Sequence, residues 1–113
     1  MEEKEHLNQF RGSELIYEHL MVGGSLALTE GCHFVRDNYS AFWLFDLIGS
    51  YQSKLSGEAF QVWTLIKSSD GADITCENGN KKVLVSQHIP FTDFPFDIII
   101  WKVEGICLLP SEY

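Results

Sequence analysis

Few side chains in this sequence could carry out covalent chemistry, and the best placed are Cys32 and His33. Thr29 is a suitable N-cap for a short helix that runs to Asn38. The dipole of that helix would lower the pKa of a thiol in its first turn, so Cys32 is the cysteine to test for reactivity. Adjacent residues on a helix point about 100° apart, which makes Cys32 and His33 a poor chelating pair for one metal ion.

A pocket between helices and sheet that holds Cys32, His33 and Asp46 would suit a small enzyme or a ligand-binding protein. A histidine beside a thiol could act as its general base. Asp46, however, lies two residues from both Leu44 and Ile48, so it should project away from the apolar stripe of its helix and reach water. The sequence therefore assigns no catalytic residue and favours a non-enzymatic protein, with this pocket as the alternative.

The rest of the sequence lacks the common signatures for metals, nucleotides and serine nucleophiles. It contains no HExxH, CxxC, EF-hand, GxxxxGK[ST], GxGxxG or GxSxG pattern. We therefore expect no metal site and no cofactor. Its cysteines, Cys32, Cys76 and Cys107, are odd in number and widely spaced, which argues against a disulfide framework and predicts a reducing, cytoplasmic location.

Length and charge limit the classes of partner. The chain has 113 residues, which suits one domain over 1–113, and a net charge of −8 from 16 acidic and 8 basic residues. Such a surface repels nucleic-acid backbones and anionic membranes, whereas it is compatible with a basic surface on a protein partner. The start of the chain lacks the apolar core of a signal peptide, and the longest apolar runs, "AFWLF" and "IIIW", are too short to span a bilayer.

An aromatic loop, "HIPFTDFPFD" over residues 88–97, is the most unusual stretch. If its rings were exposed, they would form an apolar patch of the kind that contacts other proteins. The candidate contact residues are Phe91, Asp93, Phe94, Phe96 and Asp97. The competing interpretation is that the loop crosses an end of the sheet, where at least two of the three rings enter the core and the aspartates form turns.

Three helices are predicted in the first half, after a frayed tail over 1–9. The first would begin at a Ser13 cap and end at Gly23-Gly24, although a strand over Leu15–Met21 competes with it. The second is the helix that Thr29 caps. The third and clearest is capped by Ser40 and stopped by Gly57, and its apolar stripe comprises Leu44, Leu47, Ile48, Tyr51 and Leu55.

The second half is predicted to be strands, over residues 59–67, 72–77, 81–89, 97–103 and 106–110. Asn78-Gly79 predicts a tight hairpin that places Ile74 opposite Val83 and Ala72 opposite Val85. Helices followed by strands indicate an α+β fold, with N-terminal helices packed on a four- to five-stranded antiparallel meander. An exposed edge strand, either 59–67 or 106–110, could support a homo-oligomer.

Several stretches together resemble a family of small uncharacterised bacterial proteins known only as a domain of unknown function. They are "FRGSELIYEH" (10–19), "LTEGCHFV" (28–35), "SAFWLFDLIGSYQ" (40–52), "FQVWTL" (60–65), "IPFTDFPFD" (89–97) and "LLPSEY" (108–113). Members often occur on plasmids and phages, and this resemblance implies an accessory or anti-defence role but no activity, substrate, cofactor or catalytic residue. We therefore predict a non-catalytic protein–protein interaction module, with another protein as its partner.

Overall fold

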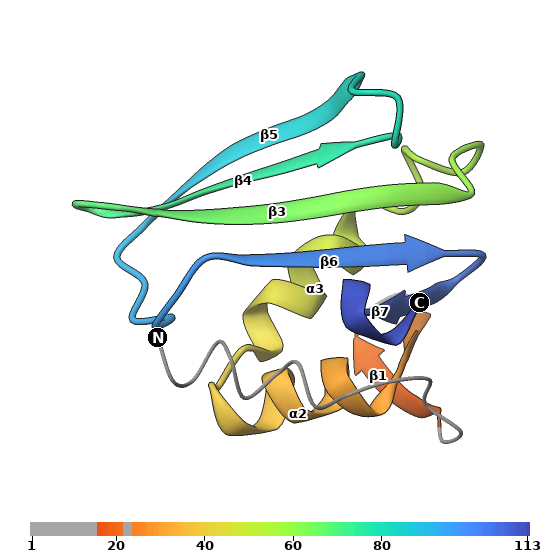
Figure 1. Ribbon diagram of the computed structural model, residues 1–113, viewed down its shortest axis with the longest axis horizontal. Helices are drawn as coiled ribbons and strands as arrows, with labels where there is room; N and C mark the ends of the chain where they lie inside the picture. The colour runs from red at the N-terminus through yellow and green to blue at the C-terminus, as the bar shows by residue number, and fades with distance from the viewer. Residues whose placement is uncertain (1–15, 22–23) are drawn as a thin grey trace.

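Strands from both ends of the chain meet in one seven-stranded sheet in the computed structural model, which describes residues 16–21 and 24–113. The strand order is β1-β2-β7-β6-β3-β4-β5 (Figure 1). In chain order the elements are β1 (Tyr17–Met21), β2 (Gly24–Leu28), α2 (Glu30–Asn38), α3 (Phe42–Ser50), β3 (Phe60–Ser68), β4 (Gly71–Glu77), β5 (Val83–Pro90), β6 (Ile98–Val103), β7 (Ile106–Leu108) and the short 3₁₀ helix η2 (Pro110–Glu112). The predicted tail over 1–9 and the Ser13 cap lie outside the described residues.

The predicted fold class is wrong in two respects. The described chain is mostly strand, with two α-helices, and its sheet is mixed because β2 pairs with β7 in parallel. A four- to five-stranded antiparallel meander under N-terminal helices does not describe it. The parallel pair joins residues about eighty positions apart, and local sequence patterns carry no signal for such a contact.

Among the described residues, Tyr17–Met21 form β1, so the helix predicted there is wrong and the competing strand over Leu15–Met21 is closer to the structure. Two large apolar residues of this segment do not face the core, because Ile16 is 52% and Leu20 is 73% exposed. The alternation of the strand instead turns His19 inward, where it is buried. The neighbouring strand β2 was not predicted.

The two α-helices follow the sequence signals in part. The Thr29 N-cap is confirmed, since its hydroxyl oxygen accepts a hydrogen bond from the main-chain N–H of Cys32 at 3.4 Å. The third predicted helix is shorter than expected, because Ser40 has a φ of 52° and Ala41 occupies the N-cap position of α3. Its apolar stripe still packs inward, as Leu44 and Ile48 are buried.

The β4–β5 hairpin forms, but its predicted register is wrong. Ile74 lies opposite Gln87 rather than Val83, and Ala72 lies opposite Ile89. The turn is longer than two residues because the Asn78 side chain accepts hydrogen bonds from the main-chain N–H groups of Asn80 and Lys82. The shift is an even number of residues, so it keeps Val85 on the core face.

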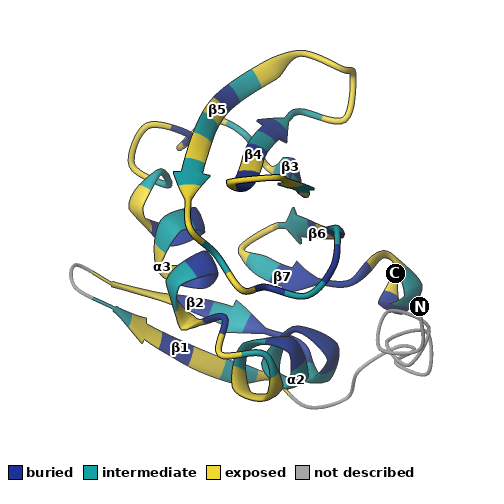
Figure 2. Ribbon diagram, turned by 90° about the vertical axis from the view of Figure 1, so that its left-hand side faces the viewer, coloured by how far each residue is buried: buried dark blue, intermediate teal, exposed yellow. Residues whose placement is uncertain are grey.

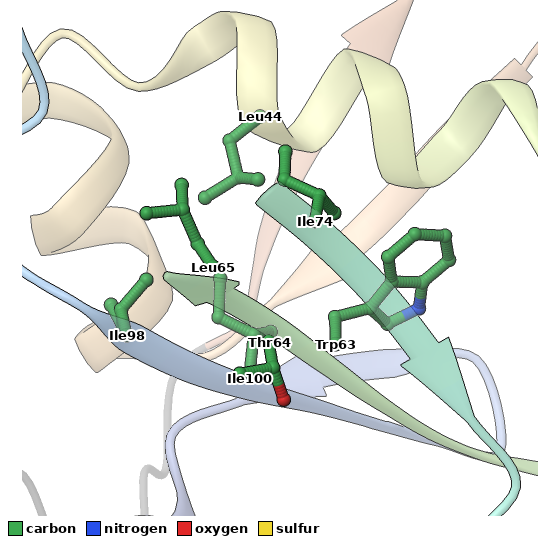
Figure 3. A pocket seen from close by; sticks show the side chains of 7 residues that line it. All are labelled: Leu44, Trp63, Thr64, Leu65, Ile74, Ile98 and Ile100. Atoms are coloured by element: carbon green, nitrogen blue, oxygen red, sulfur yellow. The ribbon is translucent and has the colours of Figure 1, made fainter. Parts of the chain in front are cut away.

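The core lies between α3 and one face of the sheet. Figure 2 shows the sheet curling so that its two ends, β5 and β1, lie on the same side with α3 between them. Leu44 of α3 packs toward Leu65, Ile74 and Ile98 of the sheet (Figure 3), and this seam leaves no space for a water molecule. Trp63 is buried there, whereas Trp43 and Trp101 are half-buried.

The opposite face of β3, β4, β5 and β6 carries no α-helix among the described residues. Paired residues on adjacent strands share a face, so Ile66, Asp73 and His88 form one row across this side. Ile99 lies on the same face, opposite Thr64. Neither of the described α-helices is long and apolar enough to cross a membrane.

Candidate functional site

The aromatic loop places two of its three rings in the core. Phe94 and Phe96 are 1% and 2% exposed, and their ring centroids lie 5.1 Å apart. Both rings contact Tyr39 edge to face, at centroid distances of 6.0 and 5.2 Å. The loop therefore closes one end of the core, as the competing interpretation expected for at least two of the rings.

Of the two aspartates of the loop, one is hydrogen-bonded to the sheet and the other is exposed. Asp97 Oδ1 accepts a hydrogen bond from the main-chain N–H of Lys67 at 2.7 Å, which ties the loop to the end of β3. Asp93 is exposed. Asp97 therefore anchors the loop through this hydrogen bond, whereas the Asp93 side chain lies at the surface.

Phe91 is the ring that stays outside. Its side chain is 91% exposed, and its main chain adopts a φ of 58°, a conformation that costs a non-glycine residue about 1–2 kcal/mol. The Phe91 main-chain N–H donates a hydrogen bond to the carbonyl oxygen of Asp70 at 2.9 Å, which holds it beside the β3–β4 turn. Among the described non-glycine residues with positive φ, Phe91 is the one large apolar side chain.

An exposed histidine between two carboxylates lies next to Phe91. His88 Nδ1 lies 2.8 Å from Asp73 Oδ1, and His88 Nε2 lies 3.5 Å from Asp70 Oδ2. The hydrogen bond to Asp73, followed by the charge of Asp70, raises the pKa of His88 above its ordinary value. Sequence reasoning missed this cluster because its hairpin register placed Asp73 opposite Leu84 instead of His88.

These side chains form one continuous patch at the end of β5, which we name the Phe91 surface. Ile66 is 47% exposed and shares its row with Asp73 and His88, so the patch combines apolar area with carboxylates. Its members are Ile66, Asp70, Asp73, His88 and Phe91. Of the five candidate contact residues from the sequence, Phe91 lies in it, and Asp93, two residues further along the loop, is exposed.

Cys32 does not have the reactive character that its helix position suggested. It is fully buried, and burial raises its pKa well above the ordinary value. The nearby Cys107 and Glu112 raise it further, and the hydrogen bond from Thr29 lowers it less than these effects raise it. Desolvation thus outweighs the helix dipole, and the thiol packs as a small apolar group.

Asp46 belongs to a polar network rather than to a pocket with Cys32. His19 Nε2 lies 2.7 Å from Asp46 Oδ1, and His19 Nδ1 lies 3.2 Å from the Arg36 guanidinium. A guanidinium can only donate, so Nδ1 of His19 must accept and Nε2 must carry the proton that it gives to Asp46. His19, 1% exposed, thus links β1 to both helices.

His33 lies further along the same network. Its ring stacks on Tyr17 with centroids 3.9 Å apart, and its Nε2 lies 3.1 Å from Asp37, which in turn accepts a hydrogen bond from Arg36. The three residues of the predicted alternative pocket therefore do not share one cavity. A surface hollow of about 330 Å³ lies elsewhere, lined by Tyr51, Lys54, Leu55, Leu84, Val85 and Ser86.

A buried carboxylate at the end of the chain was not singled out from the sequence. Glu112, 8% exposed, accepts hydrogen bonds from the Thr29 hydroxyl at 2.5 Å, the Gly31 N–H at 3.0 Å and the Leu109 N–H at 2.8 Å. A carboxylate is favoured at a helix N-terminus, so Glu112 fastens the end of the chain to α2. Leu108 and Leu109 are buried, whereas Tyr113 is 80% exposed.

Comparison with known proteins gives a family and no activity. The model of a family of unknown function, DUF6876, matches residues 1–113. No curated protein and no solved structure matches the chain. The match extends over the whole sequence and agrees with the resemblance found in its motifs, and the chain therefore belongs to the DUF6876 family.

Proposed function

We propose that this protein is a non-catalytic interaction module that binds another protein through the Phe91 surface. The observation that carries the proposal is Phe91 itself, a large apolar ring that is almost fully exposed and held at a positive φ. The positive φ works against stability, the exposed ring contributes no burial to the fold, and such residues concentrate at sites where a protein binds something. The neighbouring Phe94 and Phe96 are accounted for by core packing, so the contact role falls on Phe91.

The charges around Phe91 indicate what kind of partner surface would fit. Asp70 and Asp73 are largely exposed, with side chains 69% and 61% accessible, and Asp93, two residues after Phe91, is exposed as well. A partner that inserts an apolar pocket over the ring and surrounds it with lysine or arginine would match both the ring and the carboxylates. The net charge of −8 would speed encounter with such a partner and make it dependent on salt. An accessory role on mobile elements is compatible with this proposal.

The proposal is tested by affinity capture from a lysate of the native host with wild-type protein and two variants. Phe91→Ala should lose a stoichiometric protein that the wild type retains at low salt. The matched control is Leu20→Ala, because Leu20 is an exposed apolar residue at the opposite edge of the sheet. Equal capture by Phe91→Ala and wild type would refute a contact role for Phe91.

A further inference from the structure

The strand that ends at Phe91 is an open edge of the sheet. β5 lies at one end of the strand order, and no described element lies beyond it (Figure 1). The edges proposed from the sequence, 59–67 and 106–110, are wrong, because β3 and β7 each lie between two other strands. An open edge strand presents main-chain N–H and C=O groups to a further strand.

The pairing with β4 shows which groups face outward. The hydrogen bond from Phe91 N to Asp70 O identifies that opposed pair as hydrogen-bonded. Hydrogen-bonded and non-bonded pairs alternate along an antiparallel ladder, so Ser86 and His88 fall in non-bonded pairs and turn their main-chain groups away from β4. Pro90, the next residue of this set, has no N–H and ends the open stretch.

The two ends of β5 carry opposite charges. Lys81 and Lys82 are exposed in the turn that leads into β5, and Lys54 lines the hollow beside Leu84, near the same end. Asp70 and Asp73 lie at the other end, around His88. Glu77 lies on β4 at the positive end but is half-buried, whereas Asp70 and Asp73 are exposed. The open edge therefore runs from a positive end to a negative end.

We infer that two copies of this chain pair through β5, antiparallel and about a twofold axis. In that arrangement the lysines of one copy face Asp70 and Asp73 of the other, and the same contact repeats on the far side of the axis. With Ser86 placed opposite its own copy, Leu84 lies opposite His88 and Lys82 lies opposite Pro90. A parallel arrangement would instead bring lysines against lysines, so the charges select the antiparallel one.

The side chains along β5 suit such a contact. Ser86 on the twofold axis is small and bears no charge, so two copies can approach there without repulsion. The hollow beside Leu84 and Val85, with a volume of about 330 Å³, provides room on the core side for the end of the partner strand. The inference does not rest on the proposed function, but both use Asp70 and Asp73, so a second copy and a basic partner protein should compete.

Sedimentation equilibrium of the purified full chain is the first test. We expect a reversible monomer–dimer equilibrium at low salt that weakens about tenfold or more in 1 M NaCl, where charge interactions are screened beyond about 3 Å. Ser86→Pro, which removes an outward N–H without removing a hydrogen bond to β4, should sediment as a folded monomer. A monomeric wild type at high concentration and low salt would overturn the inference.

Two variants with reversed charges test whether the two ends of β5 are the surfaces that pair. One variant, Lys81→Glu with Lys82→Glu, makes both ends of β5 acidic, and a second, Asp70→Lys with Asp73→Lys, makes both ends basic. Each variant alone should be monomeric, and an equimolar mixture should form a heterodimer. Dimerisation of either variant alone, or a mixture that stays monomeric, would contradict pairing through β5 and favour another edge or a foreign peptide.

Discussion

The main-chain N–H of Phe91 donates a hydrogen bond to the carbonyl oxygen of Asp70 at 2.9 Å, across the end of the β4–β5 pair. This bond continues the ladder of β4 and β5 for one step beyond Pro90. It holds Phe91 at a φ of 58° with its ring in solvent. This one hydrogen bond therefore accounts for both the position and the positive φ of Phe91. Of the three phenylalanine rings in the aromatic loop, that of Phe91 is the one that does not pack in the core.

Replacing Phe91 by asparagine should stabilise the fold while it weakens partner binding. Asparagine tolerates positive φ better than phenylalanine, and little buried area is lost because the ring is exposed. We expect the free energy of unfolding to rise by up to about 1 kcal/mol, measured by urea denaturation. A clear loss of stability would show that the ring has a packing role.

Phe94→Ala should behave in the opposite way. Phe94 is 1% exposed and packs on Tyr39 and Phe96, so truncation removes buried area and leaves a cavity. We expect a loss of about 3–5 kcal/mol, a large part of the stability of a domain of this size. Asp93→Ala, at an exposed position of the same loop, serves as the control and should change stability by less than about 0.5 kcal/mol.

Stability should depend on the protonation of His88. Its folded-state pKa is raised above 6.5 by the hydrogen bond to Asp73, so protonated His88 stabilises the fold. This contribution is fully present below pH 6.5 and is lost as the pH rises through the raised folded-state pKa. NMR titration of the imidazole should give a pKa above the ordinary value in wild type and a lower pKa in Asp73→Asn. Identical titration curves would contradict the contact.

The Glu112 contacts should make the end of the chain important for stability. Glu112→Ala leaves the Thr29 hydroxyl and two N–H groups without their acceptor, which should cost about 3 kcal/mol in chemical denaturation. Gly31→Ala should also destabilise, because a Cβ there would lie 2.6 Å from Glu112 Oε1. Tyr113→Ala is the neighbouring control and should cost less than about 1 kcal/mol, since Tyr113 is exposed.

Cys32 should be inert in the folded protein. Its thiol is buried and its pKa is raised, so reaction with a disulfide reagent at pH 8 requires the fold to open. We expect the native protein to react roughly a hundredfold or more slowly than the urea-unfolded chain. Rapid labelling of native Cys32, located by peptide mass spectrometry, would restore the enzyme alternative.

Local signals predicted the parts of the fold that depend on local interactions. The Thr29 cap of α2 and the strand β3 were both expected, and each rests on neighbouring residues. The β2–β7 pair and the β4–β5 register were not, because the first joins distant segments and the second depends on extra hydrogen bonds to Asn78. Local sequence patterns therefore could not predict either the β2–β7 pairing or the β4–β5 register.

The candidate site was likewise predictable from the sequence only in part. Phe91, Phe94 and Phe96 have the same side chain and similar neighbours, so the sequence could nominate the loop but could not separate the exposed ring from the buried two. His88 and Asp73 are fifteen residues apart and meet only in the observed register. Asp46 was expected to reach water, and although its side chain is 57% accessible, its contact with His19 depends on the unpredicted strand β1.

The most direct test of the central claim measures binding and stability on the same two variants. Once affinity capture has identified a partner, its dissociation constant would be compared for wild type, Phe91→Asn and Leu20→Asn. We predict that Phe91→Asn weakens binding at least about tenfold while remaining as stable as wild type, and that Leu20→Asn binds normally. Unchanged affinity for Phe91→Asn, with the fold intact, would contradict the account.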